Sequence, residues 1–96
     1  MIFDINSSII ISVEKISKIL KKMKNNPNNI GFVDLFRVCE FYFGKPRNKG
    51  TSHCVFKTPW QGDPRINIQN AKGKAKAYQV KQVLLAVKKL EDKKYG

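Results

Sequence analysis

Two short segments in which polar and apolar residues alternate constrain the fold of this chain more than any other feature. Within residues 53–58 and 65–69, the pairs Cys54/Phe56 and Ile66/Ile68 each lie two positions apart, and polar residues fill the other positions except Val55. This is the period of a β-strand that buries one face and exposes the other. The connecting segment 59–64 carries two prolines, a glycine and an aspartate, which is typical of a hairpin loop. The pattern therefore predicts an antiparallel hairpin that packs one face on a core.

Matching the apolar positions of the two segments assigns each side chain to a face. The core face is expected to contain Cys54, Phe56, Ile66 and Ile68. The exposed face is expected to contain His53, Lys57, Arg65, Asn67 and Gln69. Most exposed histidines have no special role, but His53 is the only histidine in the chain and would lie beside basic and amide groups. Because histidine gains and loses a proton near neutral pH, His53 is the first candidate for chemistry.

Apolar residues at helical spacing predict three helices around this hairpin. The first is expected to begin at Ser12, which can serve as an N-cap, and to end at the polar turn 25–29. Its apolar stripe is Val13, Ile16, Leu20 and Met23. Residues 1–11 carry no strong period, and they either lead flexibly into this helix or extend it.

The second helix is expected over about 33–43, with Gly44 as its C-cap, and the last over about 77–92. Segment 45–49 contains a proline, which cannot donate to a ladder, and is expected to form a short edge strand.

The expected fold is therefore α+β, with a three-stranded antiparallel sheet packed on helices. The chain has 96 residues, which is enough for one domain. Residues 1–30 would form an N-terminal extension and helix, and residues 31–92 an α-β-β-β-α core.

Positive charge is concentrated in the second half of the chain. Residues 1–44 carry 6 basic and 4 acidic groups, a net +2, whereas residues 45–96 carry 13 basic and 3 acidic groups, a net +10. Such a field favours nucleic acid, an anionic membrane surface or an acidic protein, and the simplest alternative is a solubilising surface. The lysines are spread over strands and loops rather than along one amphipathic helix, which disfavours a membrane surface.

The sequence predicts no metal site, no cofactor and no membrane span. Cys39 and Cys54 are each surrounded by apolar residues and are expected to be buried and reduced. Without close-spaced ligands, these cysteines and the lone histidine fall short of a zinc site, and no nucleotide-binding glycine motif is present. The longest apolar run, 83–87, is too short to cross a membrane and the start has no signal-peptide pattern, so a cytoplasmic protein is expected.

The segment around the histidine resembles a family motif. Gly50-Thr51-Ser52-His53-x-x-Phe56 is similar to the G-S/T-S-H-x-x-F segment of HicA toxins, the small mRNA interferases of bacterial and archaeal toxin–antitoxin pairs. A second segment, NIQ at 67–69 with GKAKxYQVKQ at 73–82, is similar to one branch of that family. The resemblance covers about 14–91.

This resemblance implies a fold, an activity and a partner. The fold would be that of a double-stranded-RNA-binding domain with an extra N-terminal helix. The activity would be cleavage of mRNA without the ribosome, His53 would be the essential histidine, and a HicB-like antitoxin would neutralise the protein. The chain departs from the commonest family pattern at Cys54 and in its longer, more apolar stretch before Glu14.

RNA can be cleaved without a metal when the ribose 2′-OH attacks the adjacent phosphate, and His53 can then serve as the base or the acid. The residues expected to stabilise the phosphorane are Lys49, Lys57 and Arg65, and those expected to hold the RNA backbone are Lys72, Lys74 and Lys76. Thr51 and Ser52 would orient His53, contact phosphate or merely cap a turn. The second proton-transfer group would be a lysine, Tyr78 or water.

One alternative function uses the same fold without catalysis. A non-catalytic RNA-binding module of this type would bind RNA with a steep dependence on salt and leave it intact. Against this alternative, the basic residues around the start of the last helix are limited to Lys74, Lys76 and Lys81.

Overall fold

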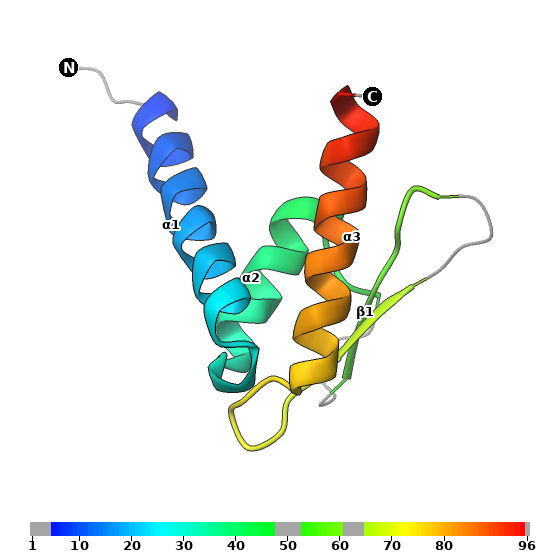
Figure 1. Cartoon of the computed structure of the whole chain (residues 1–96). Helices are drawn as coiled ribbons and strands as arrows, with labels where there is room; N and C mark the ends of the chain where they lie inside the picture. Colours follow the sequence, from blue (N-terminus) through cyan, green and yellow to red (C-terminus); the bar gives the residue numbers. More distant parts are fainter. Residues whose placement is uncertain (1–4, 48–52, 61–64, 96) are drawn as a thin grey trace.

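The computed structural model describes residues 5–47, 53–60 and 65–95, and the elements below follow the chain in Figure 1. They are α1 (Ile5–Asn25), the 3-10 turn η1 (Pro27–Asn29), α2 (Phe32–Phe43), β1 (His53–Phe56), β2 (Ile66–Gln69) and α3 (Ala77–Tyr95). The described part of the chain is thus an α+β domain in which a two-stranded antiparallel sheet packs on helices. No helix in these ranges is both long and apolar enough to cross a membrane.

Helix α1 begins at Ile5, so the alternative that residues before Ser12 extend the helix is confirmed from there on. Ser12 lies inside the helix, and its prediction as the N-cap was wrong. The preceding residues contain no glycine or proline that would stop the helix. Val13 is 46% exposed, whereas Ile16 and Met23 are buried, because α1 with its 21 residues extends beyond the 12-residue α2.

Helix α2 begins and ends close to its predicted bounds. Gly31 is its N-cap, and Asp34 in the first turn forms an ion pair of 3.7 Å with Arg37. At the other end Gly44 has φ +86°, a conformation that disfavours side chains, and its N–H donates to the Glu40 carbonyl over 3.0 Å. The predicted C-cap is therefore confirmed.

The hairpin has the predicted core face, and the structure adds its register. Cα partners are His53 with Gln69, Cys54 with Ile68, Val55 with Asn67, and Phe56 with Ile66. The four residues predicted for the core face, Cys54, Phe56, Ile66 and Ile68, are all buried.

The edge strand expected at 45–49 is not formed in its described part. Residues 45–47 make no β-bridge, and the sheet of the described chain has two strands; residues 48 and 49 lie outside the described ranges. The segment still runs beside β1, because the Arg47 N–H donates to the Val55 carbonyl over 2.8 Å. Pro46 lacks an N–H and so cannot add a ladder bond of its own.

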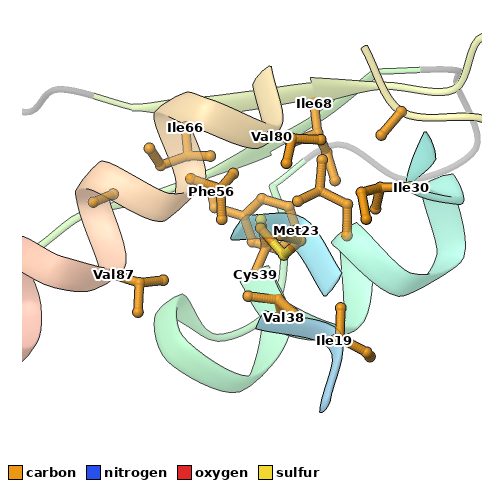
Figure 2. Packing of buried hydrophobic residues seen from close by; sticks show 14 of the residues in the cluster. Ile19, Met23, Ile30, Val38, Cys39, Phe56, Ile66, Ile68, Val80 and Val87 are labelled. Carbon is orange, nitrogen blue, oxygen red and sulfur yellow. The ribbon is translucent and has the colours of Figure 1, made fainter. Parts of the chain in front are cut away.

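Phe56 lies at the centre of the core, between the sheet and the helices (Figure 2). Its ring meets that of Phe36 edge to face at 5.7 Å between centroids. Fully buried Met23, Leu35 and Val80 bring one side chain each from α1, α2 and α3 into the same cluster. Burying a side chain as large as Phe56 contributes about 1.5–3 kcal/mol. The packing around Phe56 therefore helps to hold the sheet and the three helices together.

Trp60 attaches the start of the hairpin loop to the helices. Its ring packs against Phe43 at the end of α2, with 6.4 Å between centroids. The Lys89 Nζ from α3 lies 4.5 Å from the centre of the same ring, which is a favourable cation–π distance. The residues that follow Trp60 up to position 64 lie outside the described ranges.

Cys39 and Cys54 are free and buried, as predicted. Burial raises the pKa of the Cys39 thiol, and the nearby Cys54 raises it further by charge repulsion. Burial alone raises the pKa of Cys54. Both thiols are therefore held in the neutral form, in which cysteine behaves as a small apolar residue.

The raised pKa of Cys39 predicts a loss of stability at alkaline pH. Above about pH 8.5 the thiol ionises in the unfolded chain but not in the folded one, so each further pH unit costs up to about 1.4 kcal/mol. Urea unfolding of the wild type and of Cys39→Ala between about pH 7 and pH 10 measures this difference. We expect the wild-type free energy of unfolding to fall more steeply, and parallel curves would contradict the buried, protonated thiol.

Candidate nucleic-acid interface

The face of the hairpin that points away from the core carries the candidate site. His53 and Asn67 are exposed on it, and Val55 and Gln69 are half-buried. The helices cover the opposite face, since α2 contacts both strands and α3 contacts β2. The exposed location predicted for His53 is therefore confirmed.

Hydrogen bonds at the two edges show which side chains on this face lie closest. The Gln69 N–H donates to Gln79 Oε1 over 2.8 Å, and the Val55 carbonyl accepts from Arg47. Both groups point away from the opposing strand, which marks the His53–Gln69 and Val55–Asn67 pairs as the non-hydrogen-bonded pairs of the ladder. In such pairs the Cβ atoms are about 4.5–5.5 Å apart. The amide of Gln69 is thus the side chain directly opposite the imidazole of His53.

Lys57 and Arg65 lie at the other end of the hairpin from His53. Both are exposed. Lys57 directly follows β1 and Arg65 directly precedes β2, so they continue the register beyond the pair of Phe56 and Ile66. Lys57 lies four positions after His53, which corresponds to roughly 13 Å along a strand. The two cations therefore lie on the predicted face but not beside the imidazole, and they suit the RNA backbone better than the reacting phosphate.

A tight turn follows β2 directly. Lys72 has φ +54° and Gly73 φ +86°, so both central residues are left-handed, as in a type I′ turn. Ala71 and Lys74 exchange backbone hydrogen bonds of 2.8 and 3.1 Å across the turn. The Gly73 N–H also donates to Asn70 Oδ1. The segment between β2 and α3 therefore contains a closed turn that presents Lys72 to solvent.

This turn is attached to the start of α2. The Phe32 N–H donates to the Gly73 carbonyl over 3.0 Å, and the Ala75 N–H donates to the Ile30 carbonyl over 2.9 Å. Lys74 Nζ donates to Asn29 Oδ1 over 2.7 Å, so this predicted RNA-binding ammonium also has a structural contact. The sequence offered no signal for Asn29, since its partner is 45 positions away.

Lys76 immediately precedes α3, and its carbonyl accepts from the N–H groups of Gln79 and Val80. Its side chain is half-buried, whereas those of Lys72 and Lys74 are exposed. The first turn of α3 contains no acidic residue. Three lysines thus gather near the positive end of a helix dipole, which is a setting that attracts phosphate groups.

Gln79 is a residue that the sequence analysis did not assign to the site. It is only 4% exposed, and besides accepting from Gln69 it donates through Nε2 to the Tyr78 hydroxyl over 3.2 Å. Its spacing to Val83 and Val87 could have revealed it, because positions four apart share a helix face and both valines are buried. Gln79 connects the start of α3 to the strand position opposite His53.

Three of the predicted site residues, Lys49, Thr51 and Ser52, and the motif glycine Gly50 lie outside the described residues. Among the described residues, no group of three or more His, Cys, Asp or Glu side chains could hold a metal ion. Two hollows, of about 280 and 780 Å³, are lined by helices, and neither includes His53. Since His53 and Asn67 are exposed, the described part of the candidate site is an open face, a shape that suits a polymer better than a small molecule.

Replacing Gln79 with leucine tests the link between α3 and the hairpin. Gln79→Leu keeps the volume but leaves the Gln69 N–H without its acceptor, so we expect the free energy of unfolding to fall by about 1–3 kcal/mol. Urea unfolding measures the change. The control Gln82→Leu makes the same replacement at an exposed position of the same helix. Equal stabilities for the two variants would contradict the structural role of Gln79.

Comparisons of the whole chain with known protein families, curated proteins and solved structures found no match. The resemblance to HicA toxins is therefore carried by the segments 50–56 and 67–82 and by the residues that accompany them. The functional argument below depends on these segments and on the geometry of the hairpin.

Proposed function

We propose that this chain is the toxin of a type II toxin–antitoxin pair, an endoribonuclease similar to HicA toxins that cuts mRNA through His53. The observation that carries the proposal is the register of the hairpin. It puts the only histidine of the chain on the exposed face, directly opposite Gln69, while every core residue of the two strands points the other way. The motif resemblance names this same histidine as the essential residue of the family.

The charge around this face favours RNA as the substrate. Lys57 and Arg65 are exposed at one end of the hairpin, and Lys72 is exposed on the turn that follows the other end. Cations at several places along an open face can contact successive phosphates of one strand. Exposed Asn67 and half-buried Gln69 add amide groups that can hydrogen-bond to bases or to the ribose 2′-OH.

The chemistry proposed is transesterification within the RNA. The ribose 2′-oxygen attacks the adjacent phosphorus while a base accepts its proton, and the bond from phosphorus to the 5′-oxygen breaks as an acid protonates that oxygen. The products are a 2′,3′-cyclic phosphate and a 5′-hydroxyl. His53 can act as the base or as the acid, since histidine exchanges protons near neutral pH.

Gln69 has a supporting role in this scheme. Its amide can donate and accept hydrogen bonds but does not transfer protons at neutral pH, so it can orient the imidazole or the phosphate without replacing the second proton-transfer group. That group remains a lysine, Tyr78 or a water molecule. Gln79 holds the backbone of Gln69 and thereby helps to position this pair.

An acidic antitoxin similar to HicB is the proposed protein partner. The half of the chain that contains the hairpin carries a net charge of +10 from 13 basic and 3 acidic residues, which would attract an acidic protein. A partner that covers the exposed hairpin face would hide His53 and the surrounding cations together. It would block both the binding and the cleavage of RNA.

Removing the imidazole tests the catalytic assignment. His53→Ala is expected to reduce cleavage of a defined RNA by at least about 100-fold, the scale of one lost general acid or base. Gel analysis of end-labelled RNA in the presence of EDTA measures the rate, and treatment of the ends identifies the cyclic phosphate. The exposed position predicts an unchanged circular dichroism spectrum and unfolding midpoint. Wild-type protein that binds RNA and leaves it intact would instead support a non-catalytic RNA-binding module.

Removing one cation from the hairpin tests the RNA-binding face. In the His53→Ala background, Lys57→Ala is expected to weaken RNA binding and to lower the slope of log K against log salt by about 0.7, the value for one contact to a single strand. Fluorescence anisotropy over a salt series measures both. The control Lys18→Ala removes the same charge from an exposed position on α1. Equal effects of the two changes would mean that binding depends on net charge alone.

A further inference from the structure

A groove between α1 and α3 lies away from the candidate site. It has a volume of about 780 Å³, and Leu20 from α1 and Leu84 and Leu85 from α3 are among the residues that line it. Figure 1 shows the two helices diverging from the end where α1 finishes and α3 begins, toward the end that carries both chain termini. Among the described residues, α1 contacts neither strand, whereas α3 contacts both α1 and β2. The groove and the hairpin thus lie on different sides of α3.

The middle of this groove exposes apolar surface. Leu85 is 70% exposed, although it lies among the charged residues Lys81, Lys88 and Asp92 of α3. Val13, 46% exposed, lies four and seven positions before Ser17 and Leu20, so it continues the groove-facing side of α1. Together with Leu20 from α1 and Leu84 from α3, Leu85 gives the groove apolar side chains from both helices, and exposed apolar patches mark interaction surfaces.

The charges of the groove are ordered along its length. Lys21 and Lys24 lie where α1 ends, close to the start of α3. Glu91 and Asp92 lie near the end of α3, at the opposite end of the groove. The groove therefore has two lysines at one end and leucines in its middle, whereas Glu91 and Asp92 lie at the other end, one helical turn after Lys88.

We propose that the occupant of this groove is a second copy of the chain, packed by the same surface in the antiparallel sense. A two-fold axis through the middle of the groove would bring Lys21 and Lys24 of each copy over Glu91 and Asp92 of the other. The same axis would bring the two Leu85 side chains together at the centre. A surface that complements itself in this way is the requirement for an isologous dimer.

The order of charges favours a second copy over an acidic partner. An acidic helix laid along the groove would be attracted by Lys21 and Lys24 but repelled by Glu91 and Asp92 at the other end. A basic helix would be attracted by Glu91 and Asp92 but repelled by Lys21 and Lys24. A partner with both signs in reversed order pairs the two lysines at one end and the two carboxylates at the other, and the antiparallel copy has that order.

The size of the surface lies at the lower limit for a specific dimer. Helices of 21 and 19 residues are roughly 30 Å long and about 10 Å wide, so their combined face is roughly 600 Å². A standard specific interface buries about 800 Å² on each partner. The four helices of the dimer would bury Leu85 and Val13, the two exposed apolar residues described above.

Because α3 separates the groove from the hairpin, the dimer leaves both copies of the exposed hairpin face open. One particle would then present two faces with a His53 each, pointing away from the dimer axis. This arrangement goes beyond the proposed function and does not depend on it, since the groove contains none of the residues assigned to RNA.

Sedimentation velocity of the full-length chain over a concentration series tests the dimer. At an ionic strength of about 0.15 M, which screens the repulsion between two basic chains, we expect a monomer–dimer equilibrium with a Kd of the order of 10 μM. Leu85→Glu is expected to raise the Kd at least about 10-fold, because it puts two like charges on the axis. The side chain is exposed in the monomer, so its circular dichroism spectrum and unfolding midpoint should not change.

Matched variants separate this surface from a general effect of charge. Val33→Glu makes the same kind of change at a 58% exposed position outside the groove and should leave the Kd unchanged. Lys24→Glu and Asp92→Lys should each weaken the dimer, and the double variant should recover affinity. A wild-type chain that stays monomeric up to about 1 mM overturns the proposal and would mean that a different protein occupies the groove. A dimer that tolerates Leu85→Glu, or a double variant without recovery, overturns it as well.

Discussion

One-sided burial of the β1–β2 hairpin is the constraint on which the rest of the structure depends. Phe56 and Ile68 are fully buried against the helices, while His53 and Asn67 remain exposed on the other face. Side chains alternate along a strand, so a slip of one residue would turn the apolar set outward and carry His53 into the core. The hydrophobic contact that holds the domain together therefore also keeps the histidine in solvent, opposite Gln69.

Polar contacts at the ends of the elements give this arrangement its rigidity. The turn at Lys72 and Gly73 is fastened to the start of α2 by backbone bonds to Ile30 and Phe32, and Gln79 fastens the start of α3 to β2. Each of these bonds joins segments that are distant in sequence or belong to different elements. The basic residues around α3 are consequently presented by fixed backbone, and less entropy is lost when a phosphate chain binds them.

Much of the fold followed from local patterns, and the misses have definite causes. Alternation identified both strands and their core face, and Gly44 was recognised as a C-cap because its position after an apolar stripe is a local signal. Ser12 was wrong as an N-cap, since a capping residue can also lie inside a helix when no breaker precedes it. The contact of Lys74 with Asn29 and that of Gln79 with Gln69 depend on tertiary packing, which sequence spacing does not encode. The roughly 13 Å between His53 and Lys57 followed from strand geometry only once the bounds of β1 were known.

By itself the sequence determined which residues face the core and where positive charge accumulates, because periodicity and composition are local properties of the chain. It therefore identified His53 as an exposed histidine in the basic half of the chain. Only the tertiary structure decided what lies opposite it and what lies far from it. The register made Gln69 its neighbour, the length of β1 separated it from Lys57, and the divergence of α1 from α3 opened a groove on the other side of α3. These are distances between segments, and they depend on how helices and strands of unequal length share one core.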